Sequence, residues 1–519
     1  MINLYLDQNL KKIKFLFFFL LLISTFLQLF LLSNYENIYS ILWLLLSNLI
    51  IYFYCFYKKN ILEFPLSTFS LIFVNFYSNS GAIFFKSFLL DSIDKNLYSP
   101  NFTFAYLFLF NFLLIIVHFI YKNLFFLNIL RKNLRKVFFL IKLDKYNSKE
   151  YLYFIGYITI FFGAFSITYL NEFIWRTSSL GPNLLGDLLN GLKILNISPF
   201  IVLYTFKIYE YDLKKEDYLK LLIFFLAALY LSLGLNSRSV FFDIFFTGLL
   251  IYCYFVFTGI IEIKVLRFNK IFFVLLISIL LSNYIDRFSN SYLQVRDYRN
   301  NINPIQNIKN HFNFFNVKKN DYLKTRNAEI SSQIFREDYY EINFLNRINV
   351  VKATDNIIYA KKYLTSDQIE KIIDYEFNKI ISILPGPLIT IFNPQFNKTS
   401  YFNTITSTIY KEVDRLYVGG KSNGIVFGIL YLYEDFWMFL LFILALLISF
   451  TLIDSFFISN KSYFIIVFIL LYLTSGGLIN VISSGSVADM LGVLIRGIPQ
   501  SIILYVLICK FYQKILNFK

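Results

Sequence analysis

Six arginines beside long apolar runs are the residues of this chain best suited to bind a phosphate group. The guanidinium group stays charged at any working pH, and its fork of N–H donors meets two phosphate oxygens at once. Arg238 is the strongest candidate, because it lies in a turn of only a few polar residues between two apolar runs, and Arg176 is the next. We predict that all six bind a pyrophosphate: Arg176, Arg238, Arg287, Arg296, Arg299 and Arg415.

Acid–base candidates are few. Of the two histidines, His118 lies in an apolar run, which indicates packing, whereas His311 lies in a polar stretch. We name His311 and Asp414 as candidates to deprotonate an acceptor hydroxyl group. Glu434 and Asp435 fall within a long apolar segment, where charge is costly, so we expect each to pair with an arginine of a neighbouring helix.

No motif for a metal or a nucleotide accompanies these residues. The P-loop, GxSxG, HExxH and strand–turn–helix GxGxxG patterns are absent from the sequence. All three cysteines, Cys55, Cys253 and Cys509, lie inside apolar runs, which argues against a disulfide framework or a CxxC metal site. The first predicted outer loop has a single carboxylate, Glu36. We therefore expect neither a metal nor a cofactor.

Membrane-spanning helices are the elements predicted to position these residues. Of the 519 residues, 57% are hydrophobic and 16% charged, whereas soluble domains carry about 25% charged residues. The apolar residues form runs of ~20, the length that crosses a bilayer as a helix. The predicted fold class is all-α, a polytopic membrane protein. Twelve candidate spans are 13–32, 38–57, 64–85, 102–121, 151–170, 188–209, 219–235, 240–260, 268–285, 424–452, 463–481 and 488–512.

The distribution of basic residues predicts the orientation and the domains. Lysine and arginine gather in alternate loops, so these loops and both termini are expected to face the cytoplasm. The same loops account for the net charge of +16, with the bilayer and not a nucleic acid as the partner. Three parts follow: 1–285 with nine spans, 286–423 as a large external loop subdomain, and 424–519 with three spans.

Two polar regions are predicted to be helical. Residues 122–150 alternate basic and apolar side chains, which is typical of an amphipathic helix on the inner leaflet. Within the external loop, apolar residues at helical spacing predict helices over 345–364 and 367–383. Ser366 or Asp367 would cap the second helix, and the prolines of 385–387 would stop it. The third, sixth and twelfth spans carry the most polar residues, Asp489 among them.

This pattern resembles the oligosaccharide repeat unit polymerases of bacterial surface polysaccharide synthesis, the Wzy-type O-antigen polymerases. The resemblance covers most of the chain as topology: about twelve spans, the pair Ser237–Arg238 at an outer turn, and a large late outer loop. That loop closes with a Gly/Ser segment leading into an aromatic span, over 419–437. The chain departs from the family at Ser239, where glycine often follows the Ser-Arg pair, and at 434–437, which lacks the family's late glycine.

The resemblance implies a metal-independent membrane glycosyltransferase of the bacterial cytoplasmic (inner) membrane. Its substrates would be oligosaccharides linked to undecaprenyl pyrophosphate, joined at the outer face, and a chain-length regulator protein is an expected partner. Two alternatives stay open. An O-antigen ligase, which transfers glycan to lipid A core, often uses a loop histidine, and His311 would suit it. A lipid-linked oligosaccharide flippase would share the span number, but the large external loop favours an enzyme.

The predicted orientation can be tested with single cysteines at Asn320 and Lys215 in a chain whose own cysteines are replaced. Intact cells are treated with a membrane-impermeant maleimide. We expect labelling at 320, in the external loop, and none at 215, in a basic inner loop. Labelling at 215 alone would reverse the orientation and remove every predicted outer site.

Overall fold

In the computed structural model most of the described residues are helical, and among them six helices are long and apolar enough to cross a membrane. These six are Tyr5–Phe30, Tyr35–Cys55, Pro100–Asn123, Lys215–Gly234, Phe436–Ser455 and Val487–Asn517. The all-α membrane class is thus confirmed, while the number of twelve spans stays a prediction. The structure describes residues 2–30, 32, 34–168, 192–234, 239–262, 291–292, 295, 304–314, 335, 339–340, 345–347, 349–401, 403–413, 426–459, 462–471 and 485–517.

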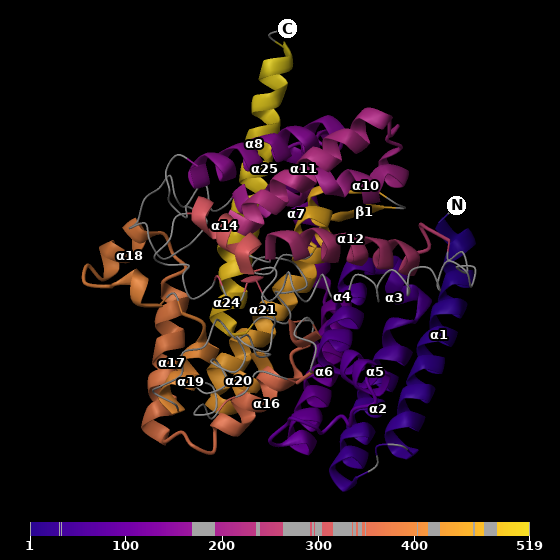
Figure 1. Cartoon of the computed structure of the whole chain (residues 1–519), viewed down its shortest axis with the longest axis vertical. Helices are drawn as coiled ribbons and strands as arrows, with labels where there is room; N and C mark the ends of the chain where they lie inside the picture. Colours follow the sequence, from indigo (N-terminus) through magenta and orange to yellow (C-terminus); the bar gives the residue numbers. More distant parts are fainter. Residues whose placement is uncertain are drawn as a thin grey trace.

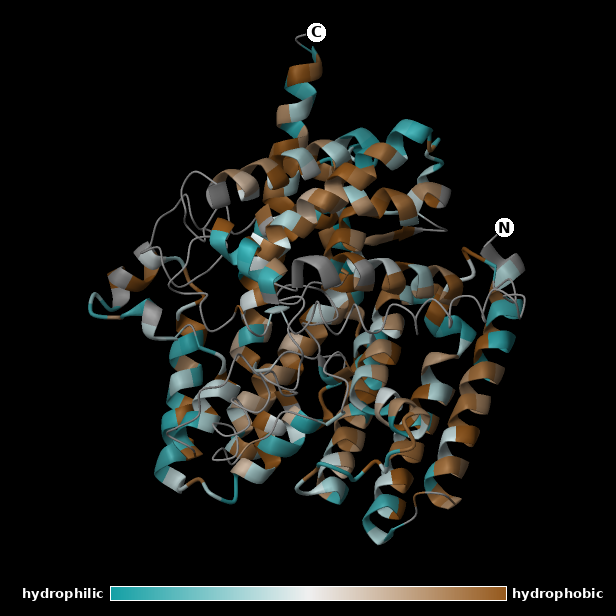
Figure 2. Cartoon of the chain, viewed as in Figure 1, coloured by the Kyte–Doolittle hydropathy of each residue, from teal (hydrophilic) through white to brown (hydrophobic). Residues whose placement is uncertain are grey.

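The N-terminal helices lie side by side and alternate in direction (Figure 1). They are α1 (Ile2–Phe30), α2 (Tyr35–Cys55), the continuous run α4 (Pro65–Asn75), η1 (Phe76–Ser80) and α5 (Gly81–Phe88), and α6 (Pro100–Asn123). The short α3 (Lys58–Glu63) joins α2 to α4. Figure 2 shows mostly hydrophobic residues along these helices, as a lipid-facing bundle requires.

A second group of helices runs across the direction of the first in Figure 1, so the two groups do not form one parallel bundle. Close packing within this group depends on small residues. A Cβ atom at Gly156 would lie only 2.1 Å from Cγ of Pro199, so α8 and α10 could not approach as they do with a larger residue. The elements are α7 (Phe125–Leu140), η2 (Leu143–Lys145), α8 (Lys149–Thr168), η3 (Lys193–Ile197), α10 (Ser198–Tyr209), α11 (Lys215–Gly234) and α12 (Ser239–Phe257).

The predicted external loop contributes several helices, as expected. Among them α17 is confirmed over nearly its predicted length, but its N-cap is Thr365, which forms a capping box with Gln368, and not Ser366 or Asp367. The prolines of 385–387 follow its end and begin α18. The elements are α14 (Pro304–Phe314), η4 (Leu345–Arg347), α16 (Val351–Ala360), α17 (Ser366–Ile381), α18 (Gly386–Phe392), η5 (Lys398–Tyr401) and α19 (Ile405–Val413).

The predicted tenth span is divided at Glu434, which corrects the expectation of an unbroken helix with two buried charges. Glu434 has a left-handed backbone (φ 51°), its side chain is exposed, and its carboxylate pairs with Lys361, not with an arginine. Asp435 accepts a hydrogen bond from the amide of Met438 (2.7 Å) and so caps the following helix. The break lets both carboxylates avoid the apolar interior. The two helices are α20 (Val426–Tyr433) and α21 (Phe436–Ser455).

The remaining C-terminal elements end in one long, curved helical run. A π-helical turn interrupts the α-helical hydrogen bonding one turn after Asp489, and Pro499 follows it. This irregular region agrees with the polar and proline residues that made the predicted twelfth span weak. The predicted ninth span, 268–285, lies outside the described residues. The elements are β1 (Phe457–Ser459) paired with β2 (Ser462–Tyr463), α22 (Ile466–Leu470), α24 (Val487–Gly492), η6 (Val493–Gly497) and α25 (Ile498–Asn517).

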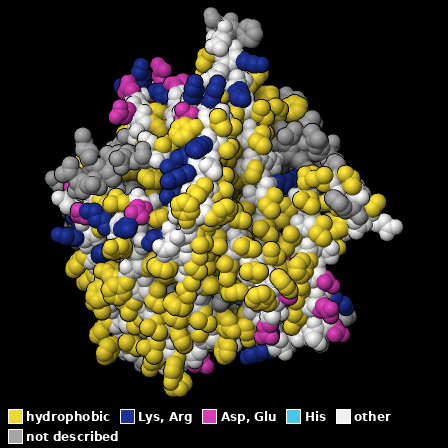
Figure 3. All heavy atoms as spheres, turned by 180° about the vertical axis from the view of Figure 1, so that it is seen from behind, with side chains coloured by type: hydrophobic (Ala, Val, Ile, Leu, Met, Phe, Trp, Pro, Cys, Tyr) yellow, Lys and Arg dark blue, Asp and Glu magenta, His cyan; other side chains and the backbone are white. Residues whose placement is uncertain are grey.

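Loops predicted to share a side of the membrane contact one another. At one end Lys58 pairs with Asp7 (2.8 Å) and Asn9 donates to the carbonyl of Ile261 (2.7 Å). At the other end, residues of the external loop contact the loop between α5 and α6. In Figure 3 most lysine and arginine side chains lie above a broad hydrophobic surface. This grouping agrees with the predicted alternation; which end faces the cytoplasm stays a prediction.

A buried carboxylate attaches the external loop to the start of α6. Asp355 of α16 is fully buried and accepts hydrogen bonds from the amides of Tyr98 and Ser99 (both 2.9 Å) and from Oγ1 of Thr103 (3.1 Å). Lys352 pairs with it at 3.1 Å. A buried anion with this many donors is stable only while all of them stay in place.

We therefore expect Asp355→Ala to lower the free energy of unfolding by about 3–5 kcal/mol, because it removes the buried carboxylate that a lysine and several hydrogen-bond donors share. Thermal unfolding in detergent measures the loss, and limited proteolysis should then cut the external loop faster. Glu370→Ala, at an exposed position of α17, is the control and should change little. Equal effects of the two substitutions would contradict the anchoring role.

Candidate functional site

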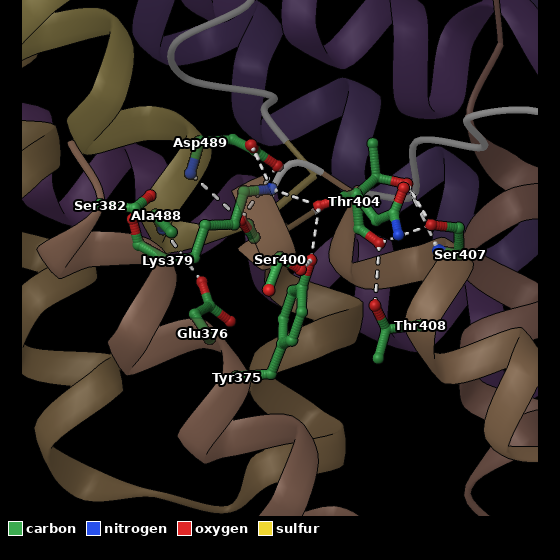
Figure 4. A network of polar contacts seen from close by, with 12 residues as sticks. Tyr375, Glu376, Lys379, Ser382, Ser400, Thr404, Ser407, Thr408, Ala488 and Asp489 are labelled. Atoms are coloured by element: carbon green, nitrogen blue, oxygen red, sulfur yellow. Dashed lines mark hydrogen bonds and ion pairs between the residues drawn. The ribbon is translucent and has the colours of Figure 1, made fainter. Parts of the chain in front are cut away.

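The external loop meets the last predicted span in a network of charged residues, which we call the insert–span junction (Figure 4). Its members are Glu376 and Lys379 of α17, Ser486 and Asp489 at the start of α24, and Tyr433 at the end of α20. Ser486 and Asp489 lie at the predicted outer end of the twelfth span, and Tyr433 lies within the predicted tenth span. On the predicted orientation, the junction is expected to lie at the outer membrane boundary.

The sequence of α17 explains why its polar residues point inward. The helix begins at the Thr365 capping box and buries Ile372. Glu376 follows four residues later and therefore lies on the same face, and Lys379 lies about one turn beyond it. A carboxylate on the apolar face of an amphipathic helix is thus carried into the contact between α17, α20 and α24.

Glu376 is the buried centre of the junction. Its Oε1 atom accepts a hydrogen bond from the amide of Ala488 (3.0 Å), and the Tyr433 hydroxyl donates to its Oε2 atom. The side chain is fully buried, and the loss of water raises the pKa of this carboxyl group, although the two hydrogen bonds partly oppose the rise. Glu376 therefore joins three helices and is shielded from solvent.

Asp489 is the accessible carboxylate of the junction. Its Oδ1 atom pairs with Lys379 Nζ at 2.7 Å, and Ser486 Oγ donates to its Oδ2 atom at 3.0 Å. The Asp489 side chain is 34% exposed, whereas that of Lys379 is 12% exposed. Lys379 also donates to the carbonyl of Asn403 (3.0 Å), which fixes the direction of its ammonium group. A held, partly exposed carboxylate can accept a proton from a substrate hydroxyl.

The structure describes one of the predicted site residues, His311. It lies on α14, is 3% exposed, and its Nδ1 atom is 3.1 Å from Oγ of Ser291, while its ring packs on Tyr292 at 4.3 Å between centroids. Burial lowers the pKa of the imidazole to about 4, so it is neutral near pH 7. A ring enclosed in this way could meet a substrate hydroxyl only if α14 moved.

The other predicted site residues lie outside the described residues, so their convergence stays a prediction. They are Arg176, Arg238, Arg287, Arg296, Arg299, Asp414 and Arg415.

Sequence reasoning missed Glu376 and Lys379. A signal for the first was present, because Glu376 stands one helical turn after the apolar Ile372 of α17, and a charge on that face needs a partner. Nothing in the sequence paired α17 with α24, more than a hundred residues away. Asp489 was visible only as a polar residue that weakened a predicted span.

Comparisons with known proteins identified no relative of this chain. No protein-family model, no curated protein and no solved structure matches the chain. The function therefore has to be argued from the residues and their geometry alone.

Two substitutions of Glu376 distinguish the effect of its charge on stability from the effect of its hydrogen bonds. Because burial raises the folded-state pKa, the protonated acid is favoured in the folded protein, and stability is lost as pH rises through that raised pKa. Glu376→Gln does not titrate and so lacks this loss. The melting temperature of the variant minus that of the parent should therefore be larger at pH 8 than at pH 5. Each unit of pKa shift corresponds to about 1.4 kcal/mol.

Glu376→Ala serves as the contrast. It leaves the Ala488 amide and the Tyr433 hydroxyl without their acceptor, so it should destabilise by about 1–3 kcal/mol across the same pH range. A Gln variant whose difference from the parent is the same at both pH values would show that Glu376 is not a buried, titrating carboxyl group.

Proposed function

We propose that this chain is a membrane glycosyltransferase that joins lipid-linked oligosaccharide repeat units into a surface polysaccharide. The observation that carries the proposal is the attachment of the described helices of the predicted external loop to helix ends of predicted spans, through the buried carboxylates Asp355 and Glu376. This attachment places the charged residues of the insert–span junction at one fixed boundary. An enzyme that acts on a substrate anchored in the outer leaflet needs such a site.

The reaction we propose is a displacement at the anomeric carbon of the donor glycan. A hydroxyl oxygen of the acceptor repeat unit forms a bond to this carbon, and the bond from the carbon to the undecaprenyl pyrophosphate oxygen breaks. The bonding electrons leave with the pyrophosphate, and the hydroxyl proton passes to a base. The reaction requires positive charge at the leaving group and a carboxylate at the acceptor.

The roles follow from the chemistry of each side chain. Arg238 and Arg176, with the other four predicted arginines, would bind the pyrophosphate and stabilise its developing charge. Asp489 is our choice of base among the described residues, because it is partly exposed and Ser486 and Lys379 hold it in place. Asp414 stays a second candidate from the sequence.

The alternatives have less support. His311 would suit a ligase, but its ring is buried against Ser291 and Tyr292. A flippase alternates between two arrangements of its spans, and large buried contacts that tie an external loop to several helices oppose such movement. Neither alternative gains a specific observation from the described residues.

Arg238→Lys tests the pyrophosphate role. The lysine keeps the charge but loses the two-pronged donor, so we expect a rate loss of order 10²–10³. Surface glycan length on a gel is the readout, with the amount of protein in the membrane as a control. Arg267→Lys, on the predicted inner side, should leave the glycan unchanged. Full-length glycan in Arg238→Ala cells at normal protein level would reject the role.

The final acceptor and the lipid-linked pool together distinguish the three functions. A lost polymerase leaves a single repeat unit on the final acceptor. A lost ligase leaves that acceptor bare, with long chains on the lipid carrier. A lost flippase leaves repeat units facing the cytoplasm.

Asp489→Asn tests the base. It keeps the size of the side chain and removes its ability to take a proton, so polymer synthesis should fall by about 10²–10⁴-fold with little change in melting temperature. Asp374→Asn changes an exposed carboxylate of α17 in the same way and should be neutral. If both variants make polymer at the parental rate, Asp489 is not the base.

A further inference from the structure

The basic helix α7 has one face packed on the protein and an opposite face that is exposed. On the packed face, Phe138 stacks on Phe456 at 4.8 Å between ring centroids and meets Phe464 at 5.5 Å. The buried residues Leu127 and Phe138 belong to this face. The helix is therefore part of the folded structure at the end of α21, and its exposed face has a fixed direction.

Arginines at the edge of the packed face hold α7 in place. The Arg131 guanidinium lies over the ring of Phe64 at 4.7 Å, and Arg135 donates to the carbonyl of Ile458 at 3.1 Å. Both residues lie one turn apart, so the helix is attached at two levels. These arginines serve the attachment, and their charge is partly used within the protein.

Lys132 and Lys136 lie on the exposed face, where their helical positions flank that of Phe125. They are exposed, stand one turn apart, and make no ion pair with any described residue. The sequence of α7 contains no acidic residue that could neutralise them. Two ammonium groups four residues apart are spaced to contact neighbouring anionic groups on a flat surface.

The rest of the exposed face is apolar, and the described residues leave it largely uncovered. Phe125, Phe126 and Leu140 are 78%, 70% and 79% exposed, and Ile129 and Val137 lie between them. Exposure of this many large apolar side chains beside two lysines is the pattern of a helix that lies in the boundary between lipid headgroups and acyl chains. α7 also begins directly after α6, a helix long enough to span the membrane.

We propose that α7 is a binding site for anionic phospholipid, in which Lys132 and Lys136 contact the phosphate headgroups and the apolar face enters the acyl region. Charge complementarity identifies the occupant, because a neutral lipid would satisfy the apolar face and leave both ammonium groups unmatched. The proposal does not depend on the glycosyltransferase function. It assigns α7 a lipid ligand beyond its part in setting the orientation.

The test uses the purified full chain in detergent, with bound lipids counted by native mass spectrometry. The probes are phosphatidylglycerol and phosphatidylcholine of equal chain length. The parent should prefer phosphatidylglycerol, and Lys132→Gln/Lys136→Gln should weaken the apparent affinity for it by roughly 20–30-fold, since each basic residue near anionic lipid contributes about a fivefold factor. Affinity for phosphatidylcholine should not change.

Two variants serve as controls. Lys214→Gln/Lys215→Gln removes two exposed lysines of another predicted inner loop and should alter phosphatidylglycerol binding by less than twofold. Lys132→Arg/Lys136→Arg keeps the charge and should keep the preference. The proposal is overturned if the parent binds both lipids equally, or if the two glutamine pairs lose the same affinity.

Discussion

Buried carboxylates that must keep all of their hydrogen-bond donors are the constraint on which the rest of this structure depends. Asp355 draws two of its donors from the residues directly before α6, and Glu376 draws its donors from α20 and α24. A carboxyl group without water is tolerated only when such hydrogen bonds are in place. Each carboxylate therefore fixes the position of one helix of the external loop relative to the ends of the spans.

Polar residues inside the helical bundle follow the same rule. Ser47, Asn75, Asn79 and Asn111 are buried between α2, η1 and α6, where they bond to one another and not to lipid. In a membrane, each polar group that faced the acyl chains without a hydrogen-bond partner would cost several kcal/mol of stability. The network thus determines which faces of these helices turn inward. The break at Glu434 avoids the same penalty by moving two charges to a helix end.

The local sequence pattern correctly predicted many of the helices. Apolar runs predicted helices of membrane-spanning length, the spacing of isoleucines predicted α17, and the mixed basic and apolar sequence of 122–150 predicted α7. Thr365 shows the limit: three adjacent polar residues can each cap a helix, and the choice depends on which side chain reaches the amide of Gln368. Helix-boundary errors of this kind arise because neighbouring residues compete for the same donor.

The sequence by itself determined the helical class, the helices that could cross a membrane and the short list of arginines suited to pyrophosphate, because these depend on side-chain type and short-range spacing. Only the tertiary structure decided that Glu376 meets Ala488, that Asp489 pairs with Lys379, and that His311 is buried. The physical reason is that the partner of a buried charge can come from any helix that packs nearby. Hydropathy and helical period carry no information about which helix that is.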